Sequence, residues 1–589
     1  MKALYIMAAA LAATSLSAAG QQLNTEVVID REIEPEVREV ARPAAFAPQL
    51  FSAPVAKLNL RAWEYDRPGQ IRRQLTVLDP ARYADTIAVS PYRGYASVGY
   101  LPAMNLGANA GYRFINRKDT RLGAWLNYSG QSYHVNPARF LDPTVSDKDK
   151  VSLSQHVFDL GADFSHNTEY GTLGIDAAFT YGTVSQPMYK SDFNQNATGF
   201  ELNAGWHSVS KKLPWHLAVG FSTFGFDKVT PGFEDYALVD ERAPYKPDAV
   251  RDYNYTIKGG IEKPFGNHSA FGLDMDLQFQ HLSQLNFLGM WDFFGGAEDV
   301  PVIYNMGDCN YNVLRFTPYY RYARAKFSAR IGVDVAVCLG EYKKTRFNAN
   351  ALMAWTPSQQ FAAWLRYEAP VRPTTLHELY NYSPYMSSMF AAGPTLVNGH
   401  GTIGVTIGPL KGFSLEIWGG CSDTDATPFM VSVDNRDLYM IASGHAFTYG
   451  ARARYSYNSL FTVHASAEGS QNGDDNVNYL WLDHAKYDVK AGFEITPIEK
   501  LTVGLDWHFR SGRNAVYCFK ADGVDLYGYD AELRSLGIVN DLGLHAAYRI
   551  SDALTVSANL QNLMCRRWQL VQGVDSPRLN GLLGVSYKF

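Results

Sequence analysis

Strict alternation of apolar and polar side chains constrains this chain more than any other feature. In "KLTVGLDWHFR", residues 500–510, every second side chain from Leu501 to Phe509 is apolar. The stretches "GLDMDLQFQ" (272–280) and "KFSARIGVDVAV" (326–337) repeat the pattern. Successive side chains on a strand point to opposite faces, so each stretch predicts a strand with one apolar and one polar face.

The length of these stretches separates two all-β classes. A soluble sandwich also alternates, but its strands are typically about 5–6 residues long. Here the runs reach the length of about 9–11 residues that a tilted strand needs to cross a bilayer. The composition of 37 Tyr, 32 Phe, 11 Trp and 49 Gly agrees with many such strands. After residue 20 no apolar run reaches the roughly 20 residues of a membrane-spanning helix. We therefore predict an all-β fold, a transmembrane antiparallel β-barrel.

Turn signals predict the number of strands. Ten short polar connections stand at Asn116–Asp119, Asn167–Glu169, Lys211–Pro214, Phe265–Asn267, Arg324–Lys326, Thr356–Ser358, Pro409–Gly412, Asn458–Ser459, Pro497–Glu499 and Ser551–Asp552. Longer connections are expected at 227–250, 285–311, 369–396, 421–445 and 512–534. Short turns at one rim and long loops at the other are typical of outer-membrane barrels. Ten turns with both chain ends at the short-turn rim give about 22 strands, within a range of roughly 20–24.

The ends of the chain suggest its processing. Residues 1–20 have the basic, apolar and small-residue regions of a signal peptide. Residues 21–91 contain scattered proline and charge and are expected to form an extended periplasmic segment. The barrel is expected to occupy 92–589. Its last strand, "LNGLLGVSYKF", carries Tyr587 and Phe589 on one face and resembles the signal that delivers outer-membrane barrels to the barrel-assembly machinery.

Two segments resemble TonB-dependent receptors of the outer membrane. The segment "APVRPTTLHELYNYSP", residues 369–384, is similar to a segment within their barrels, and "LQNLMCRRWQLVQGVDSPRLNGLLGVSYKF", residues 560–589, is similar to their closing hairpin. The resemblance implies a solute transporter in the outer membrane of a Gram-negative bacterium. The family carries a plug domain inside the barrel, but residues 21–91 show no plug pattern, so we expect a receptor-type wall without a plug.

The stretch "TEVVIDREIEPEVREVARP", residues 25–43, has two interpretations. Its start, Thr25–Ile29, resembles the box through which the same receptors contact their periplasmic energy-coupling protein. Because such a box acts on a plug, we interpret the stretch as an extended tail whose charges could dock a periplasmic partner. The energy-coupling box remains the alternative.

Charged residues on the polar faces of the strands are candidates to line the lumen. They are Asp274, Asp276, Arg330, Asp334, Arg366, Glu368, Asp506, His508 and Arg510. One hypothesis is a polar channel that sets permeation by size and charge. The other, which we favour because both signs occur together, is a set of cross-strand ion pairs that neutralise one another.

Aromatic side chains gather in two of the expected loops, Trp291, Phe293 and Phe294 in one and Tyr380, Tyr382 and Tyr385 in the other. Such side chains stack on sugars and pack against partner proteins. They would equally suit a loop that folds into the lumen and packs on itself. These three interpretations stay open.

No catalytic, cofactor or metal motif is evident, so no catalytic, cofactor-binding or metal-ligating residue is assigned and an enzyme is not expected. A net charge of −5 gives no reason to expect nucleic acid. The first functional hypothesis is passage of a polar solute, passive or gated by a partner. The second is a non-transporting scaffold in an outer-membrane complex, for example with a surface lipoprotein or within the assembly or export machinery.

Overall fold

The computed structural model describes residues 92–101, 105–135, 150–187, 192–228, 249–285, 307–390, 393–433, 436–458, 460–472, 485–520, 529–571 and 574–589. The expectations for residues 1–91 lie outside these ranges: the signal peptide, the extended segment, the missing plug and the box at Thr25–Ile29. Within the described part, no helix is both long enough and apolar enough to cross a membrane.

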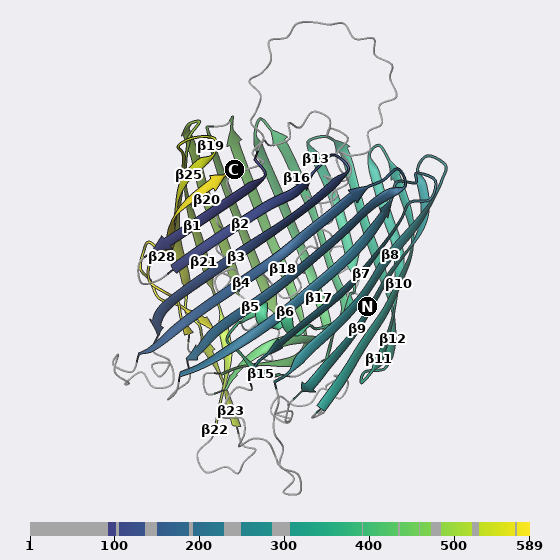
Figure 1. The fold of residues 1–589 in the computed structure, drawn as a ribbon. Coiled ribbons are helices and arrows are strands. Elements are labelled where there is room, and N and C mark those ends of the chain that lie inside the picture. Colours follow the sequence, from purple (N-terminus) through teal and green to yellow (C-terminus); the bar gives the residue numbers. More distant parts are fainter. Residues whose placement is uncertain are drawn as a thin grey trace, which may run out of the picture.

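The chain forms a closed antiparallel barrel of 22 strands, as the alternation and the turns predict (Figure 1). Neighbours in the chain are neighbours in the wall, and the first strand closes the ring by pairing with the last. The wall strands are β1 (Gly94–Leu101), β2 (Asn105–Asn116), β3 (Thr120–Val135), β4 (Val151–Asn167), β5 (Gly171–Pro187), β6 (Asp192–Ser208), β7 (Trp215–Phe226), β8 (Arg251–Phe265), β9 (Ser269–Leu285), β10 (Gly307–Arg324), β11 (Phe327–Gly340), β12 (Lys344–Ser358), β13 (Phe361–Glu368), β16 (Pro394–Leu410), β17 (Phe413–Val433), β18 (Arg436–Tyr457), β19 (Phe461–Asn472), β20 (Tyr487–Ile498), β21 (Leu501–Ser511), β24 (Val539–Arg549), β25 (Leu554–Gln561) and β28 (Asn580–Lys588).

Tight turns join the strands at one rim, and each of the ten expected short connections falls at one of them. Two turns lie slightly later than expected, because β12 continues to Ser358 and β20 to Ile498. At the turn between β16 and β17, Lys411 and Gly412 both have positive φ, 50° and 89°. Two successive left-handed residues suit a tight hairpin whose twist matches its strands.

At the other rim, paired strands occupy ranges that were expected to be long connections. Residues 421–445 are not a free loop, because β17 and β18 continue through most of this range as a paired hairpin. Asp423, Asp425 and Pro428 interrupt the apolar pattern there, which hides the strands from a sequence analysis. A further hairpin, β22 (Asn514–Lys520) and β23 (Tyr529–Ser535), extends beyond this rim (Figure 1). The small hairpin of β26 (Gln569–Val571) and β27 (Val574–Asp575) precedes the last strand.

The two faces of the wall differ in polarity. On β9 and β11, Phe271, Leu273, Ile331 and Val333 are exposed on one face. The alternate positions of β9 are polar, and Gln280 among them contacts a segment inside the barrel. The polar face is therefore the luminal one, and the apolar face is suited to lipid.

The last residue helps to close the ring. The carbonyl oxygen of Phe589 accepts hydrogen bonds from the amides of Arg93 and Gly94, at 2.8 and 2.9 Å. The rings of Phe589 and Tyr587 lie 6.2 Å apart and are both exposed on the apolar face, next to Tyr112. A role of this end as an assembly signal remains a prediction.

Candidate functional site

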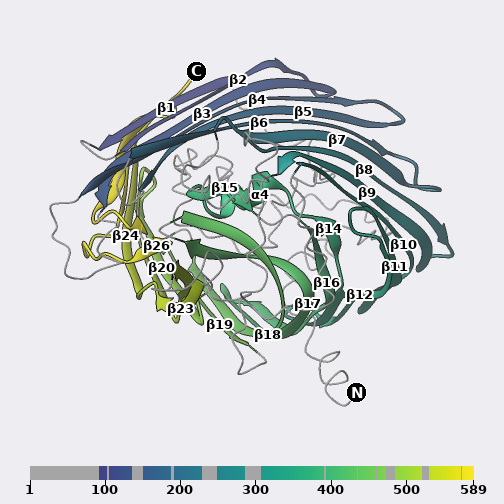
Figure 2. The same cartoon turned by 90° about the horizontal axis from the view of Figure 1, so that it is seen from below.

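The connection between β13 and β16 folds into the lumen. Residues 369–390, called here the interior segment, comprise β14 (Val371–Pro373), the short helix α4 (Leu376–Tyr382) and β15 (Met386–Phe390). Figure 2 looks into the barrel from the rim that carries β22 and β23 and shows α4 and β15 inside the ring of strands. The segment similar to TonB-dependent receptors, 369–384, is therefore an internal element of this barrel.

Local sequence explains the helix. Thr375 is its N-cap, with extended φ and ψ, and its hydroxyl accepts a hydrogen bond from the Glu378 amide at 3.2 Å. A threonine followed three residues later by glutamate is a typical helix start. Leu376, Leu379 and Tyr380 then lie on one face and are buried.

Apolar packing holds the interior segment against the wall. Five of its side chains are at most 7% exposed: Leu376, Leu379, Tyr380, Tyr385 and Met386. They share one cluster with residues of β3 to β7, β9, β10, β18 and β24. Trp568, Leu570, Val571 and Val574, from the connection that precedes the last strand, also belong to this cluster. A hydrophobic core therefore lies inside the barrel, toward the long-loop rim.

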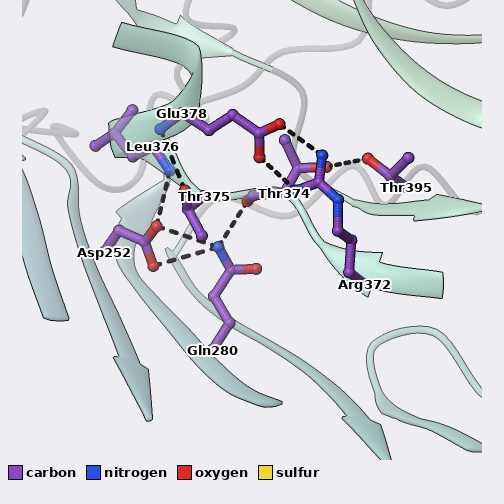
Figure 3. Close-up of polar contacts among 8 residues, drawn as sticks. All are labelled: Asp252, Gln280, Arg372, Thr374, Thr375, Leu376, Glu378 and Thr395. Carbon is purple, nitrogen blue, oxygen red and sulfur yellow. Dashed lines mark hydrogen bonds and ion pairs between the residues drawn. The ribbon is translucent and has the colours of Figure 1, made fainter. Parts of the chain in front are cut away.

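Polar contacts fix the start of the helix to the wall (Figure 3). Asp252 on β8 is fully buried, and its carboxylate accepts hydrogen bonds from the Leu376 amide at 2.8 Å and from Gln280 Nε2 at 3.2 Å. Gln280, on β9, also donates to the carbonyl oxygen of Thr374 at 2.7 Å. A buried carboxylate is stable only when hydrogen-bond donors surround it. Asp252 and Gln280 therefore anchor the interior segment to the wall and are called here its docking point.

An ion pair braces the segment internally. The Arg372 guanidinium makes two contacts of 2.5 Å with the Glu378 carboxylate (Figure 3). Burial disfavours the charged guanidinium, yet the adjacent carboxylate raises the pKa of Arg372 above its ordinary value. Next to it the hydroxyls of Thr374 and Thr395 lie 2.8 Å apart, which ties β14 to β16. The pair thus joins the two ends of a sharp bend between β14 and α4.

A glycine on the wall allows the interior segment to approach closely. A Cβ built on Gly182, on the luminal face of β5, would lie 2.4 Å from Tyr380 Oη and 3.4 Å from Tyr380 Cζ. Gly174 lies on the same face of the same strand, and a Cβ there meets nothing within 4 Å. The absence of a side chain at Gly182 is therefore specifically what lets the Tyr380 ring reach the wall.

Most luminal charges predicted from the sequence have partners on their own or a nearby wall strand. Arg330 pairs with Asp274, Arg315 with Asp276 at 2.9 Å, and Arg366 with Glu368 at 2.7 Å. Asp334 accepts hydrogen bonds from Thr317 and from Asn350. On the opposite wall His508 and Arg510 share Asp488 at 3.0 and 3.2 Å, and Asp506 meets His545 at 2.8 Å. The structure does not bring these residues together into one site.

The two sets of loop aromatics predicted from the sequence have different outcomes. Tyr380, Tyr382 and Tyr385 lie inside the barrel on the interior segment, whereas Trp291, Phe293 and Phe294 lie outside the described residues. Sequence reasoning missed Asp252, Gln280, Arg372 and Tyr439. The alternation in "RDYNYTIKGG", 251–260, does place Asp252 on the luminal face, but nothing in it indicates the buried partner.

The described residues contain no group of three or more His, Cys, Asp or Glu side chains arranged to hold a metal ion. The arrangement can obstruct the lumen, because the interior segment is packed across part of it.

Comparison with known proteins supports the fold. No protein-family model and no curated protein matches the chain. Among solved structures, a variant of the ferric enterobactin receptor PfeA from Pseudomonas aeruginosa matches with a TM-score of 0.59 and 10% identity, over 84% of this chain and 80% of the receptor. The siderophore receptor PirA from Acinetobacter baumannii matches with a TM-score of 0.60 and 9% identity, over 85% of this chain and 80% of PirA.

The ferripyoverdine receptor of the Pseudomonas aeruginosa outer membrane matches with a TM-score of 0.56 and 12% identity, over 85% of this chain and 72% of that receptor. At such identities the likeness shows the fold alone. The chain has the 22-stranded barrel fold of outer-membrane receptors.

Proposed function

We propose that the protein is an outer-membrane barrel of a Gram-negative bacterium that passes a polar solute, and that the interior segment 369–390 is its gate. The observation that carries this proposal is the packing of that segment inside the lumen, on a docking point built from Asp252 and Gln280. The receptors with the same fold support solute transport. A polar luminal face supports a polar rather than an apolar solute.

The magnitude of the packing favours gated over passive passage. Five buried side chains of the segment stabilise the closed position by about 1.5–3 kcal/mol each when compared with full exposure. Their sum, about 7.5–15 kcal/mol, is an upper value from which the entropy of ordering the segment is subtracted, and even a remainder of about 5 kcal/mol corresponds to roughly one open molecule in several thousand. Opening therefore requires binding energy from a solute or a partner, and an unassisted open channel is disfavoured.

The interior segment also offers a physical rationale for a receptor-type wall whose plug we propose to be absent. We propose that residues 21–91 form a periplasmic tail and that the interior segment takes over the obstruction of the lumen. In this proposal the charged stretch 25–43 docks a periplasmic partner, and the last strand with Tyr587 and Phe589 is recognised by the barrel-assembly machinery.

A scaffold without transport remains the second candidate, and one observation favours it. The β22–β23 hairpin extends beyond the rim, and in the described part of the sheet β23 pairs only with β22. A strand edge at this position could accept a strand of a surface lipoprotein.

Planar-bilayer recordings separate the two candidates. The variant replaces residues 375–390 by a glycine and serine linker that keeps β14 and β16. The gate proposal expects a nearly silent wild-type barrel and a large, steady conductance from the variant. A silent variant that still folds as a barrel, together with a lipoprotein that copurifies in equal amounts, would establish the scaffold instead.

A further inference from the structure

The interior segment belongs to a sheet that lies over the long-loop end of the barrel. Its last element, β15, pairs in parallel with β18, with Met386 opposite Asp437 and Phe390 opposite Tyr439. On the other side of the hairpin, β17 pairs in parallel with β22 through Val431, Ser432 and Val433. With β23 the order is β15–β18–β17–β22–β23, called here the mouth sheet.

Side-chain contacts reinforce the link between the segment and this sheet. Tyr439 on β18 is buried, and its hydroxyl donates to the carbonyl oxygen of Leu379 in α4 at 3.1 Å. Its ring meets the Tyr382 ring edge to face, with centroids 5.9 Å apart. The helix and the sheet are therefore joined by backbone pairing, a hydrogen bond and ring packing at the same place.

The mouth sheet is connected to the wall through irregular backbone. The β17–β18 ladder shifts register between Thr424 and Thr427, and strands bend where a ladder is interrupted in this way. Gly512, just before β22, has a φ of +67°, which ends β21 and redirects the chain. Both joints lie between the regular wall and the mouth sheet.

We propose that the interior segment and the mouth sheet move as one unit about these joints, so that opening the lumen displaces the β22–β23 hairpin as well. The inference rests on the proposed function, because it names the moving part of the proposed gate. A binder of that hairpin would then bias the gate without entering the lumen, since a ligand shifts an equilibrium by its differential affinity for the two positions.

Spin-label distances test the motion without any transport assay. The variant L376D places a second carboxylate in the apolar core beside Asp252 and so expels the segment. One pair of labels, at position 381 in α4 and position 325 in the β10–β11 turn, reports whether the interior segment has left the wall. The second pair joins position 531 in β23 to position 325, in a background where the exposed Cys565 is replaced by serine.

If the segment and the mouth sheet move together, the distances of both label pairs change in L376D. The distance between positions 531 and 325 should change by about 5 Å or more, which is one strand spacing. If the pair at 381 changes while the pair at 531 keeps its wild-type distribution, the segment moves alone and the inference fails. A shift at both positions in a barrel that never conducts would refute the proposed function and leave the inference standing.

A disulfide provides a second test, which needs no spin label. M386C/D437C joins β15 to β18 at a paired position, and the usual spacing of neighbouring strands, about 4.8 Å, lies within the Cα range of a disulfide. In the L376D background the oxidised disulfide should leave conductance unchanged, because the two strands travel together. Loss of conductance on oxidation, restored by reductant and absent in the single-cysteine control L376D/M386C, would show that the segment must leave β18.

Discussion

The Asp252 carboxylate accepts a hydrogen bond of 2.8 Å from the Leu376 amide, 124 residues away in the sequence. This contact fixes a helix inside the lumen to a wall strand, and neither group is accessible to solvent. In a core of this kind a carboxylate stays only when donors compensate its lost hydration. A single change at Asp252 is therefore expected to loosen the interior segment.

Removal of this carboxylate should loosen the gate. D252A removes the acceptor of the Leu376 amide and one of the two acceptors of Gln280 Nε2, which weakens the closed position by about 1.5–3 kcal/mol. Brief openings in planar bilayers should become roughly tenfold or more frequent, although the barrel stays mostly closed. The control is D176A on β5, whose carboxylate contacts Asn203 and not the interior segment. Equal opening frequencies in both variants would contradict the assigned role.

The Arg372–Glu378 pair should show measurable coupling. A double-mutant cycle with R372M and E378Q is expected to give about 1–2 kcal/mol in the unfolding of the segment, because the pair is only partly exposed. The matched pair Arg366–Glu368 on β13 is more exposed, and R366M and E368Q should couple by no more than about 1 kcal/mol. Hydrogen exchange of the α4 amides measures the free energy of local unfolding of the segment in the R372M/E378Q cycle. Coupling no larger than in the control pair would mean that the brace is unimportant.

Gly182 should be specifically intolerant of a side chain. G182A places a Cβ against Tyr380 Oη and should loosen the segment by about 1–3 kcal/mol, whereas G174A on the same face should stay within about 0.5 kcal/mol. Y380F removes the clashing oxygen, so the double variant G182A/Y380F should recover most of the loss. Proteolysis within residues 383–390 reports the loosening. A double variant as loose as G182A would show that the contact at the hydroxyl is not the cause.

Luminal ion pairs should affect selectivity more than stability. In the linker-replaced barrel, D274N leaves Arg330 without its carboxylate and should shift the reversal potential toward anion preference. The melting temperature should hardly change, because such partly exposed pairs contribute about 1 kcal/mol or less. A reversal potential unmoved by D274N would place this pair away from the solute path.

The wall could be predicted from the sequence because its physics is local. Alternation over Leu501–Phe509 sets the faces of a strand, and turns such as Lys411–Gly412 mark its ends. Ten turns therefore gave the correct strand number. The boundaries moved by two or three residues at Ser358 and Ile498, where the pairing resumes after an irregularity at a Thr-Pro dipeptide.

The interior could not be predicted in the same way. Asp252 and Leu376 are brought together only by closure of the ring, and neither has a local signal for burial. The sequence "TLHELYNY", 375–382, contains a helix start, but an amphipathic helix on a loop could equally face solvent or a partner. Likewise Tyr380 and Tyr385 are recognisable as aromatic anchors, while the glycine beneath Tyr380 is only one of 49.

Solute influx measures the central claim most directly. Liposomes that contain the wild-type barrel or the variant with 375–390 replaced by a linker are placed in solutions of small polar sugars, and the initial swelling rates are compared. If the interior segment is the gate, the variant swells many times faster than the wild type at equal protein content. Equal rates, fast or slow, would contradict this account, because the segment would then not control passage through the barrel.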